Sequence, residues 1–289
     1  MTHLDNKKEG NGADPFPPVV DLSNPSQDEV IAQIATACST FGFFQVINHG
    51  MSEELISSFR ECCLVDYFRL PHETKVQWKR NQSNARGFFD DELTKQKRDW
   101  KECLDVGVPN TRDWAVPDES MSNHCLDGYN QLPPADVLPK FRPTLVKYFD
   151  ECAELSHRIA VLMAKGLGED ESHPFIRELR SDHSSYLRTN YYPPCTAVNE
   201  DTSRDDIAPL GISPHKDAGF LTVLLQDEDC HSLQVQCPND KSKWITVHPA
   251  PGSLTINTGT CKTGYFFAWL SFFVPSSFCI SAKNGSLDF

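Results

Sequence analysis

The spacing of apolar residues divides the chain near Ser184 into a helical part and a strand-rich part. The longest helical pattern covers Asp136–Gly166, where apolar residues recur three and four positions apart. This stripe consists of Phe141, Leu145, Tyr148, Cys152, Leu155, Ile159 and Leu162. The spacing predicts one long helix, at about Pro139–Lys165, that packs as a scaffold on a sheet.

Two shorter helices and two strands are predicted nearer the N-terminus. Short strands are expected at Val19–Leu22 and Phe43–Asn48. The run Ser26–Glu29 (S-Q-D-E) is a capping box, and Gly42 supplies the left-handed residue that ends the helix it opens. Ser52 caps a second helix with an acidic first turn, which suits the helix dipole. The apolar face of the first helix is Val30, Ile34, Ala37, Cys38 and Phe41.

After Ser184 the pattern changes to short apolar or alternating runs, separated by clusters of Gly, Pro, Asp and Asn. The runs are Ser185–Tyr192, Phe220–Leu225, Ser232–Gln236, Trp244–Val247 and Ser253–Asn257. Several short strands with turns between them indicate a β-sandwich or a barrel. The expected layout is therefore a helical N-terminal half and a β-rich C-terminal half.

Composition narrows the class of protein. A chain of 289 residues can bury one large core or two modest ones. The net charge of −13 argues against nucleic acid or an anionic membrane surface as a partner. The 11 cysteines are odd in number and include no C-x-x-C pair, which favours reduced thiols in a cytoplasmic protein. Met1–Asp14 has no apolar stretch and does not read as a signal peptide.

The longest apolar stretch lies near the C-terminus. Gly264–Val274 is rich in aromatic residues and is followed by Pro275. A membrane-spanning helix needs about 20 apolar residues, and this stretch is much shorter. We therefore expect a buried strand here, with a tail anchor as the alternative.

The candidate chemistry centres on His215-Lys216-Asp217. On a strand, residues two apart share a face, so His215 and Asp217 would stand side by side with Lys216 turned away. An imidazole and a carboxylate so placed suit divalent iron, and one more histidine would complete a facial triad. An H-x-D alone is weak evidence, and His3-Leu4-Asp5 is a second one in the N-terminal tail. The site at His215 gains weight from the turn before it and the apolar strand after it.

Two longer segments carry a family resemblance. Tyr186–Cys195 reads Y-L-R-T-N-Y-Y-P-P-C, and Leu210–Gln226 reads L-G-I-S-P-H-K-D-A-G-F-L-T-V-L-L-Q. Further blocks are Gly42–Gly50, Arg86–Phe88, Asp99–Gly107 and Trp244–Gly259. Over about residues 18–259 the chain resembles the Fe(II)- and 2-oxoglutarate-dependent dioxygenases of the plant and isopenicillin N synthase type. The resemblance implies an α+β fold: a double-stranded β-helix (jelly-roll) core with flanking helices and a helical N-terminal region.

The same resemblance implies a site and a reaction. His215 and Asp217 would bind Fe(II), and Asn190 and Tyr192 would face inward to hold the cosubstrate 2-oxoglutarate. A tyrosine hydroxyl can donate to the distal carboxylate of that cosubstrate. The expected enzyme is an oxidoreductase that hydroxylates or desaturates a small organic substrate with O2, with ascorbate as a candidate reductant. We expect a cytoplasmic monomer.

The resemblance ends at Gly259. The family continues with a distal histidine ligand and an arginine for the cosubstrate, but this sequence has no His after His248 and no Arg after Arg204. The last core strands are therefore expected to be missing, and catalysis to be impaired. Three hypotheses stay open at this stage: an oxygenase, a non-catalytic relative that binds a ligand or a partner, and a non-functional isoform or mis-predicted gene product.

The remaining histidines have structural or surface interpretations. His49 matches a turn of the family, His231 is expected in a surface loop, and His248 is expected to be exposed. The expected division of the chain is a disordered tail (1–15), an N-terminal dioxygenase region (16–120), a linker with the scaffold helix (121–182), a partial oxygenase core (183–259) and a divergent tail (260–289).

Overall fold

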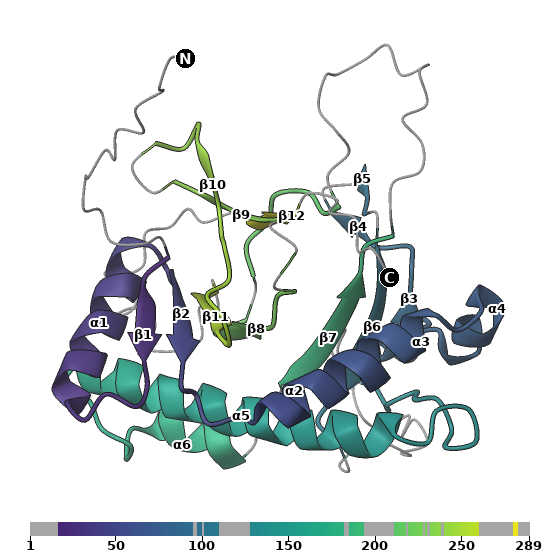
Figure 1. The fold of residues 1–289 in the computed structure, drawn as a ribbon, viewed down its shortest axis with the longest axis horizontal. Coiled ribbons are helices and arrows are strands. Elements are labelled where there is room, and N and C mark those ends of the chain that lie inside the picture. The colour runs from purple at the N-terminus through teal and green to yellow at the C-terminus, as the bar shows by residue number, and fades with distance from the viewer. Residues whose placement is uncertain are drawn as a thin grey trace, which may run out of the picture.

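The computed structural model describes residues 17–94, 97–99, 101–109, 128–181, 185–193, 211–217, 219–227, 229, 232–237, 240–259 and 280–282 (Figure 1). Its main helices are α1 (Gln27–Thr40), α2 (Glu53–Phe59), α5 (Phe141–Gly166) and α6 (Pro174–Ser181). A π-helix, η1 (Arg60–Val65), continues α2 and leads to the short segments α3 (Asp66–Phe68), α4 (His72–Lys75) and η2 (Val76–Trp78). The predicted N-terminal tail and the apolar run Gly264–Val274 lie outside the described residues.

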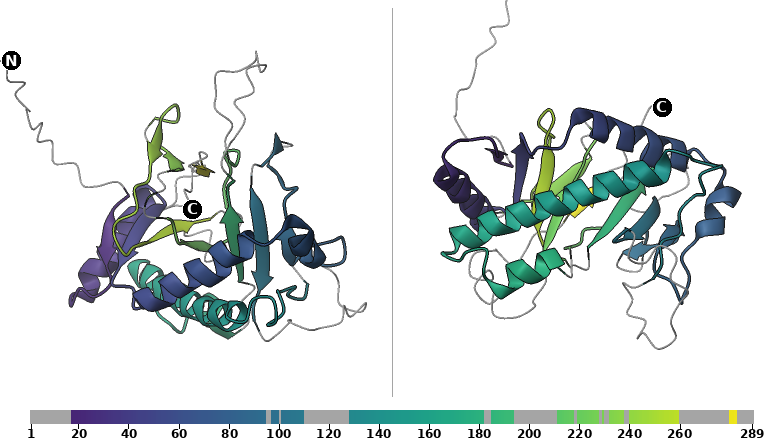
Figure 2. Two further views of the ribbon diagram at one scale, coloured as in Figure 1. Left: turned by 45° about the vertical axis from the view of Figure 1, so that its right-hand side comes forward. Right: turned by 90° about the horizontal axis from the view of Figure 1, so that it is seen from below.

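The long scaffold helix is confirmed. Helix α5 spans Phe141–Gly166, close to the predicted bounds, and its apolar stripe is buried except at Cys152, which is partly exposed. Helices α1, α2 and α6 all contact α5, which runs beneath the sheets (Figure 2). An apolar sheet face must pack against another element, and this helix supplies much of the apolar surface that covers it.

The predicted signals at the ends of α1 are also confirmed. The Ser26 hydroxyl accepts a hydrogen bond from the Glu29 amide at 3.4 Å, which is one half of the predicted capping box, while the Ser26 amide donates to Asn24 Oδ1 at 2.9 Å and not to the Glu29 side chain. Gly42 has φ +68° and donates its amide to the Ala37 carbonyl, so it ends the helix in the left-handed conformation. Of the predicted apolar face, Val30, Ile34, Ala37 and Cys38 are buried.

A four-stranded sheet joins the two halves of the chain. Its order is β1-β2-β11-β8, formed by Val19–Asp21, Phe43–Ile47, Leu254–Thr258 and Leu221–Leu224. Strand β1 is parallel to β2, and β11 is antiparallel to both β2 and β8. The long helices do precede Ser184, but the two halves are not separate layers, because N-terminal strands pair directly with C-terminal ones. Local spacing predicts a strand but carries no information about its partner.

A three-stranded sheet stands on the other side of the molecule from this one (Figure 1). Its order is β3-β6-β7, formed by Gly87–Phe89, Glu102–Gly107 and Tyr186–Tyr191, with antiparallel pairing throughout. The hairpin β4-β5 (Leu93–Thr94 and Lys97–Arg98) follows β3. Strands β3 and β6 lie in blocks that the sequence marked only by family resemblance.

The third sheet includes part of the divergent tail. Its order is β10-β9-β12, formed by Trp244–Thr246, Leu233–Gln236 and Ile280–Ala282. Strand β12 pairs antiparallel with β9, so three residues of the tail form an edge strand of this sheet. Among the described residues after Gly259, this is the only strand.

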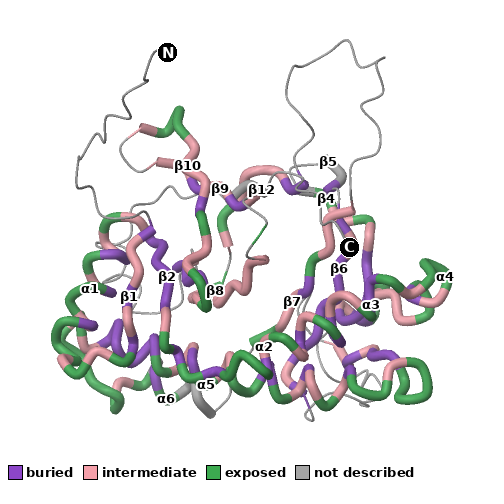
Figure 3. The backbone as a smooth tube through the Cα atoms, viewed as in Figure 1, coloured by how far each residue is buried: buried purple, intermediate pink, exposed green. Residues whose placement is uncertain are grey.

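The core follows from these pairings. One large cluster of buried side chains joins α1, α2 and α5 to β2 and β11, and a small second cluster consists of Phe43, Leu233, Val235 and Val247. Strand β11 is buried along its whole length, whereas β8 is half-buried throughout (Figure 3). The six described cysteines are free thiols. No helix in the described part of the chain is long and apolar enough to cross a membrane.

Candidate metal site and cosubstrate wall

The structure brings His215 and Asp217 together. His215 Nε2 lies 3.6 Å from Asp217 Oδ1, and the two side chains are 27% and 22% exposed. His215 Nδ1 lies 3.0 Å from the Ser213 carbonyl oxygen, which can only accept, so Nδ1 carries the proton. Nε2 is then unprotonated, and its lone pair is directed toward the Asp217 carboxylate. An imidazole binds a metal ion through an unprotonated ring nitrogen of this kind.

The local backbone differs from the prediction in one respect. His215 forms only an isolated bridge, Asp217 is in irregular structure, and the regular strand β8 begins at Leu221. Pro214 has no amide hydrogen to donate to a ladder, which explains why the strand does not extend through this segment. Lys216 is exposed, as expected. The pairing of His215 with Asp217 therefore depends on side-chain hydrogen bonds more than on strand geometry.

The second oxygen of the Asp217 carboxylate is held by two hydrogen bonds. Its Oδ2 accepts hydrogen bonds from Thr222 Oγ1 at 2.7 Å and from Asn257 Nδ2 at 2.8 Å. Thr222 is in β8 and Asn257 is in β11, and their Cα atoms are direct partners in the sheet register. The sequence analysis did not identify either residue as part of the site, because the sheet pairing that joins them is not visible in the sequence.

The environment favours the ionised carboxylate. Burial alone would raise the pKa of Asp217, but the nearby His215 imidazole and hydrogen bonds from Asn257 and Thr222 outweigh it and lower the pKa to about 2. Burial likewise opposes protonation of His215, while the nearby Asp217 carboxylate and the hydrogen bond to the Ser213 carbonyl raise its pKa above the usual value. A deprotonated carboxylate is the state that binds a metal ion.

Asn190 and Tyr192, the predicted cosubstrate residues, lie at the end of β7. The Cys103 thiol on β6 donates to Asn190 Oδ1 at 3.2 Å, and these two residues are cross-strand partners. The Asn190 side chain is exposed and Tyr192 is half-buried. Burial, with the nearby Cys103 and Asp99, raises the pKa of the Tyr192 hydroxyl, so this hydroxyl is a proton donor at neutral pH.

Electrostatic interactions connect the strands β6 and β7, which we call the wall of the site, to the pair formed by His215 and Asp217. The negative charge of Asp217 raises the pKa of Tyr186 on β7, after the larger effect of burial. The positive charge of Lys101 opposes protonation of His215, although it is a minor cause compared with burial. That Asn190 and Tyr192 point at bound 2-oxoglutarate stays a prediction.

A network of ion pairs lines the same wall, and the sequence analysis missed it. Arg188 binds Asp105 and Glu92, and Lys101 binds Glu92 at 2.7 Å and Asp99 at 3.3 Å. The signal was present in D-W-K-E-C-L-D, where Asp99, Lys101 and Asp105 are spaced by even numbers of residues, as side chains on one face of an extended segment are. Because both cations are paired with carboxylates, neither is arranged to receive the carboxylate of a cosubstrate.

The donor set fits two positions of a facial triad. No group of three or more His, Cys, Asp or Glu side chains that could hold one ion occurs in the described residues. His49 has a structural role, as predicted: it is buried, contacts the Gly252 carbonyl through Nε2 and accepts from the Met51 amide through Nδ1. His248 is exposed, as predicted, and His231 lies outside the described residues. His215 and Asp217 would hold the ion.

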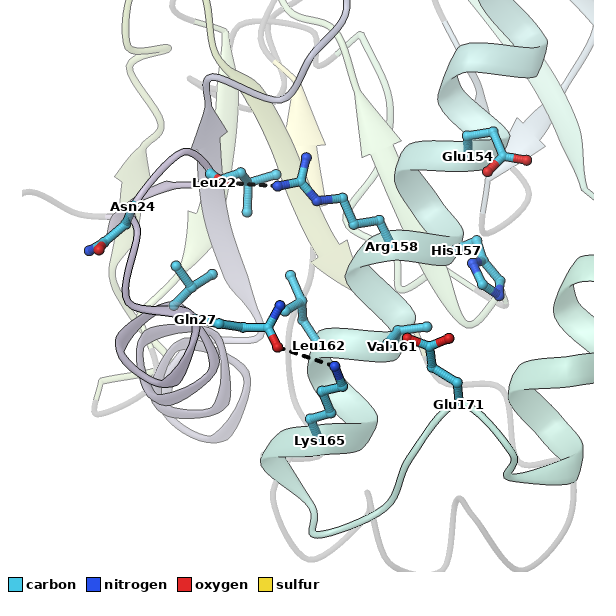
Figure 4. A pocket seen from close by; sticks show the side chains of 11 residues that line it. Leu22, Asn24, Gln27, Glu154, His157, Arg158, Val161, Leu162, Lys165 and Glu171 are labelled. Carbon is cyan, nitrogen blue, oxygen red and sulfur yellow. Dashed lines mark hydrogen bonds between the residues drawn. The ribbon is translucent and has the colours of Figure 1, made fainter.

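A separate cavity of about 310 Å³ lies between α1 and α5, outside the two sheets (Figure 4). Its polar side chains are of mixed charge; Arg158 donates to the Leu22 carbonyl at 2.8 Å, and Lys165 donates to Gln27 Oε1 at 3.2 Å. The first bond ties α5 to the residue after β1, and the second ties it to the start of α1. We therefore interpret this cavity as a gap in the packing between the two helices.

Comparison with known proteins identifies the family. Residues 17–135 match the family model described as "non-haem dioxygenase in morphine synthesis N-terminal", and residues 183–276 match the 2OG-Fe(II) oxygenase superfamily. The chain is 32% identical over 244 residues to flavanone 3-dioxygenase 2 of Oryza sativa subsp. japonica, covering 84% of this chain and 63% of that protein. It is 34% identical over 230 residues to gibberellin 20 oxidase 2 of Oryza sativa subsp. indica, covering 79% and 53%.

Solved structures show the same fold. The structure of "JOX2 in complex with 2OG, Fe, and JA" aligns with TM-score 0.65 at 25% identity, over 94% of this chain and 75% of that one. The dioxygenase for auxin oxidation in rice aligns with TM-score 0.66 at 22% identity, over 93% and 78%. The architecture is therefore the jelly-roll of the 2-oxoglutarate oxygenases, with helices packed around it.

The family models, the relatives and the fold define a non-haem oxygenase, and the chain belongs to the Fe(II)- and 2-oxoglutarate-dependent dioxygenase superfamily. Fe(II) and 2-oxoglutarate are the metal and the cosubstrate typical of this family. The chain spans 53–63% of the length of the two rice relatives named above. The match to the second family model extends to residue 276, beyond the point at which the sequence resemblance ended.

Proposed function

We propose that His215 and Asp217 are two protein ligands of Fe(II) in an oxygenase site that acts on a small organic molecule. One observation carries the proposal: Nε2 and Oδ1 lie 3.6 Å apart, while the atoms behind them, Nδ1 and Oδ2, are occupied by hydrogen bonds. Two ligand atoms at that separation can reach one ion at ordinary Fe–N and Fe–O distances of roughly 2.0–2.2 Å. Bound iron with 2-oxoglutarate would supply the activation of O2.

The chain's own residues would bind and orient the cosubstrate. Tyr192, whose hydroxyl stays protonated at neutral pH, is proposed to donate to a carboxylate of 2-oxoglutarate. Asn190 is proposed to contribute a second polar contact, with its amide oriented by the Cys103 thiol. The half-buried face of β6 and β7 would then separate the cosubstrate from bulk water. The substrate itself is proposed only as a small organic molecule.

Metal titration tests the ligand assignment. Anaerobic calorimetry with Fe(II), or with Mn(II) as a redox-stable substitute, is expected to give one site in the wild-type chain. His215→Ala and Asp217→Ala should each abolish it or weaken it by about two orders of magnitude or more. The matched control is His248→Ala, which removes an exposed imidazole and should leave affinity unchanged. Tight one-to-one binding that survives both site variants would refute the assignment.

We also propose that residues 1–289 alone have little or no 2-oxoglutarate turnover. Residues 260–289 contain neither a histidine nor an arginine, and Arg188 and Lys101 are already paired with acids. An arginine fork normally binds the cosubstrate carboxylate through two parallel hydrogen bonds, and a chain without it loses affinity. Weak metal binding without turnover would support the interpretation as a non-catalytic relative.

The assay is succinate formation by purified protein with Fe(II), ascorbate and 2-oxoglutarate. The expected result is a rate near background for residues 1–289. A chimera in which a family C-terminus replaces residues 260–289 should form succinate if the rest of the site is intact. Robust succinate formation by residues 1–289, abolished by His215→Ala, would overturn the proposal of impaired turnover and support the proposed ligands.

A further inference from the structure

Two polar side chains converge on a single oxygen of Asp217. Thr222 Oγ1 and Asn257 Nδ2 donate to Oδ2 at 2.7 and 2.8 Å, and they come from two neighbouring strands at directly paired positions. The sheet ladder between β8 and β11 therefore fixes the separation of the two donors. Charge-assisted hydrogen bonds of this kind are stronger than neutral ones and are sensitive to direction.

The arrangement sets the orientation of the carboxylate. With Oδ2 held by two donors, the plane of the carboxylate is determined, and Oδ1 is the oxygen that faces His215 Nε2. A carboxylate held in this way offers one oxygen to a metal ion, because the second is engaged by the sheet. His215 is held in a similar manner through Nδ1 by the Ser213 carbonyl.

The side chain of Asn257 has a buried oxygen without a donor, which the stability of the fold does not explain. Its side chain is only 2% exposed, and its amide nitrogen must face Asp217 because a carboxylate only accepts hydrogen bonds. Its amide oxygen is consequently buried, and no described atom donates to it. A buried acceptor without a donor destabilises a fold, so an apolar residue would serve the sheet better at this position. The polar residue instead serves the carboxylate.

We propose that Thr222 and Asn257 are positioning residues that fix Asp217 as a ligand through one oxygen, and so set the metal affinity of the site. The proposal rests on the proposed function, in that Asp217 must bind the ion. Removal of a residue that hydrogen-bonds to a metal ligand commonly lowers the metal affinity by about 10–100-fold. Because Thr222 and Asn257 donate to the same oxygen, their effects are coupled, and removal of either donor should weaken binding.

The test measures Mn(II) affinity of the apo chain by calorimetry, with far-UV circular dichroism and urea unfolding to verify folding. Thr222→Val keeps the shape and removes the donor, and it should weaken binding about 10-fold or more. Asn257→Leu should have a similar effect. Thr222→Ser restores the hydroxyl and should return affinity to within about threefold of wild type.

The control is Thr255→Val, the same substitution on the same sheet. Thr255 is 1% exposed and donates to Gln226 Oε1 at 2.7 Å, so its loss affects folding stability without touching Asp217. Its Mn(II) affinity should stay near that of wild type. The visible spectrum of bound Co(II), which reports ligand geometry, should change in Thr222→Val and remain unchanged in Thr255→Val.

The outcomes separate the two proposals. Wild-type affinity in folded Thr222→Val and folded Asn257→Leu would overturn the positioning role while leaving His215 and Asp217 as ligands. If only one of the two variants folds, its affinity alone decides the matter. Equal weakening by Thr255→Val would also overturn the positioning role, because it would show a general effect of sheet stability. Failure of the wild-type chain to bind Mn(II) at all would refute both proposals together.

Discussion

Arg188 of β7 and Asp105 of β6 form a two-point ion pair across adjacent strands. Arg188 Nε and Nη2 lie 2.7 and 2.8 Å from the two oxygens of Asp105, and the two residues are cross-strand partners in the sheet register. Arg188 Nη1 lies 3.1 Å from Glu92 Oε1. The guanidinium is thus surrounded by carboxylates, and its role is to join the wall of the site to the hairpin that follows β3.

The first prediction concerns this ion pair. Arg188→Met keeps much of the side-chain volume but leaves the buried Asp105 carboxylate, 7% exposed, without its counter-ion. The free energy of unfolding should fall by about 2–4 kcal/mol, measured by urea denaturation. Lys243→Met is the control, because Lys243 is 73% exposed and its pair with Asp240 should contribute less than about 0.5 kcal/mol. A loss below about 1 kcal/mol in Arg188→Met would contradict the prediction.

The second prediction concerns acid stability. Burial would raise the pKa of Glu92, but the hydrogen bond from Lys101 and the charges of Arg188 and Lys101 lower it below its usual value of 4.5. A carboxyl with a depressed folded-state pKa stabilises the fold above the unfolded value, and this contribution is lost as pH falls through the folded pKa.

The comparison is between the wild-type chain and Glu92→Gln, which keeps the shape and removes the charge. Their difference in unfolding free energy should be largest at about pH 6–7 and should shrink below pH 4.5. Urea denaturation at a series of pH values measures it, and the other carboxylates cancel in the difference. A difference that is constant with pH would show that the ionised form of Glu92 is not the stabilising species.

The third prediction concerns Gln45, which is 2% exposed on β2. Its Nε2 donates to the His248 carbonyl at 2.9 Å, and its Oε1 accepts from the Ala250 amide at 2.6 Å and the Ser253 hydroxyl at 2.8 Å. Gln45→Met leaves these groups without partners and should cost about 2–3 kcal/mol. Hydrogen exchange at the Ala250 amide should accelerate.

Gln236→Met provides the reference for Gln45→Met. Gln236 donates to the Lys241 carbonyl at 2.6 Å in an exposed setting, and water can replace that bond. Its loss should cost about 0.5 kcal/mol or less. Equal effects of the two substitutions would mean that Gln45 does not fasten the loop that precedes β11.

The fourth prediction compares two glycines that face each other. A Cβ on Gly259 would lie 2.0 Å from the Gly219 carbonyl oxygen and 2.9 Å from the Asp217 carbonyl oxygen, both backbone atoms that cannot yield easily. Gly259→Ala should therefore destabilise the fold by about 1–3 kcal/mol or more and displace the segment that carries Asp217. Weaker Mn(II) binding should accompany the loss of stability.

Gly219→Ala is the matched control, because a Cβ there meets nothing within 4 Å. It should be neutral or stabilising by up to about 1 kcal/mol, since alanine restricts the unfolded chain. Urea denaturation and calorimetry with Mn(II) measure both variants. A result in which Gly219→Ala is the more damaging change would show that the approach of these two backbone segments is not as the structure has it.

Much of the fold could be predicted where the signal was local. The amphipathic stripe predicted helix α5 to within two residues at its start and one at its end, and the Ser26 and Ser52 caps marked the starts of α1 and α2. Five of the strand runs after Ser184 correspond to β7, β8, β9, β10 and β11. These signals survive in a single sequence because caps and hydrophobic periods act over a few residues.

The candidate site was predictable in part. His215 and Asp217 are two residues apart in the chain, so their proximity could be predicted from the sequence. The family resemblance indicated that these two residues bind the metal. Thr222 and Asn257 are separated by a whole hairpin and more, and only the pairing of β8 with β11 brings both to one oxygen. The π-helix η1 after α2 also left no recognisable mark in the sequence.

The sequence by itself determined the elements, the H-x-D pair and the family, because each depends on residues close together in the chain or on ordered motifs. Only the tertiary structure decided which strands pair: β2 with β11, β6 with β7, and β12 of the divergent tail with β9. Strand partners are chosen by burial of one sheet face and by backbone hydrogen bonds between distant segments, and neither is encoded in local spacing. The same pairings bring two hydrogen-bond donors to Asp217 and join Arg188 to Asp105 across β6 and β7.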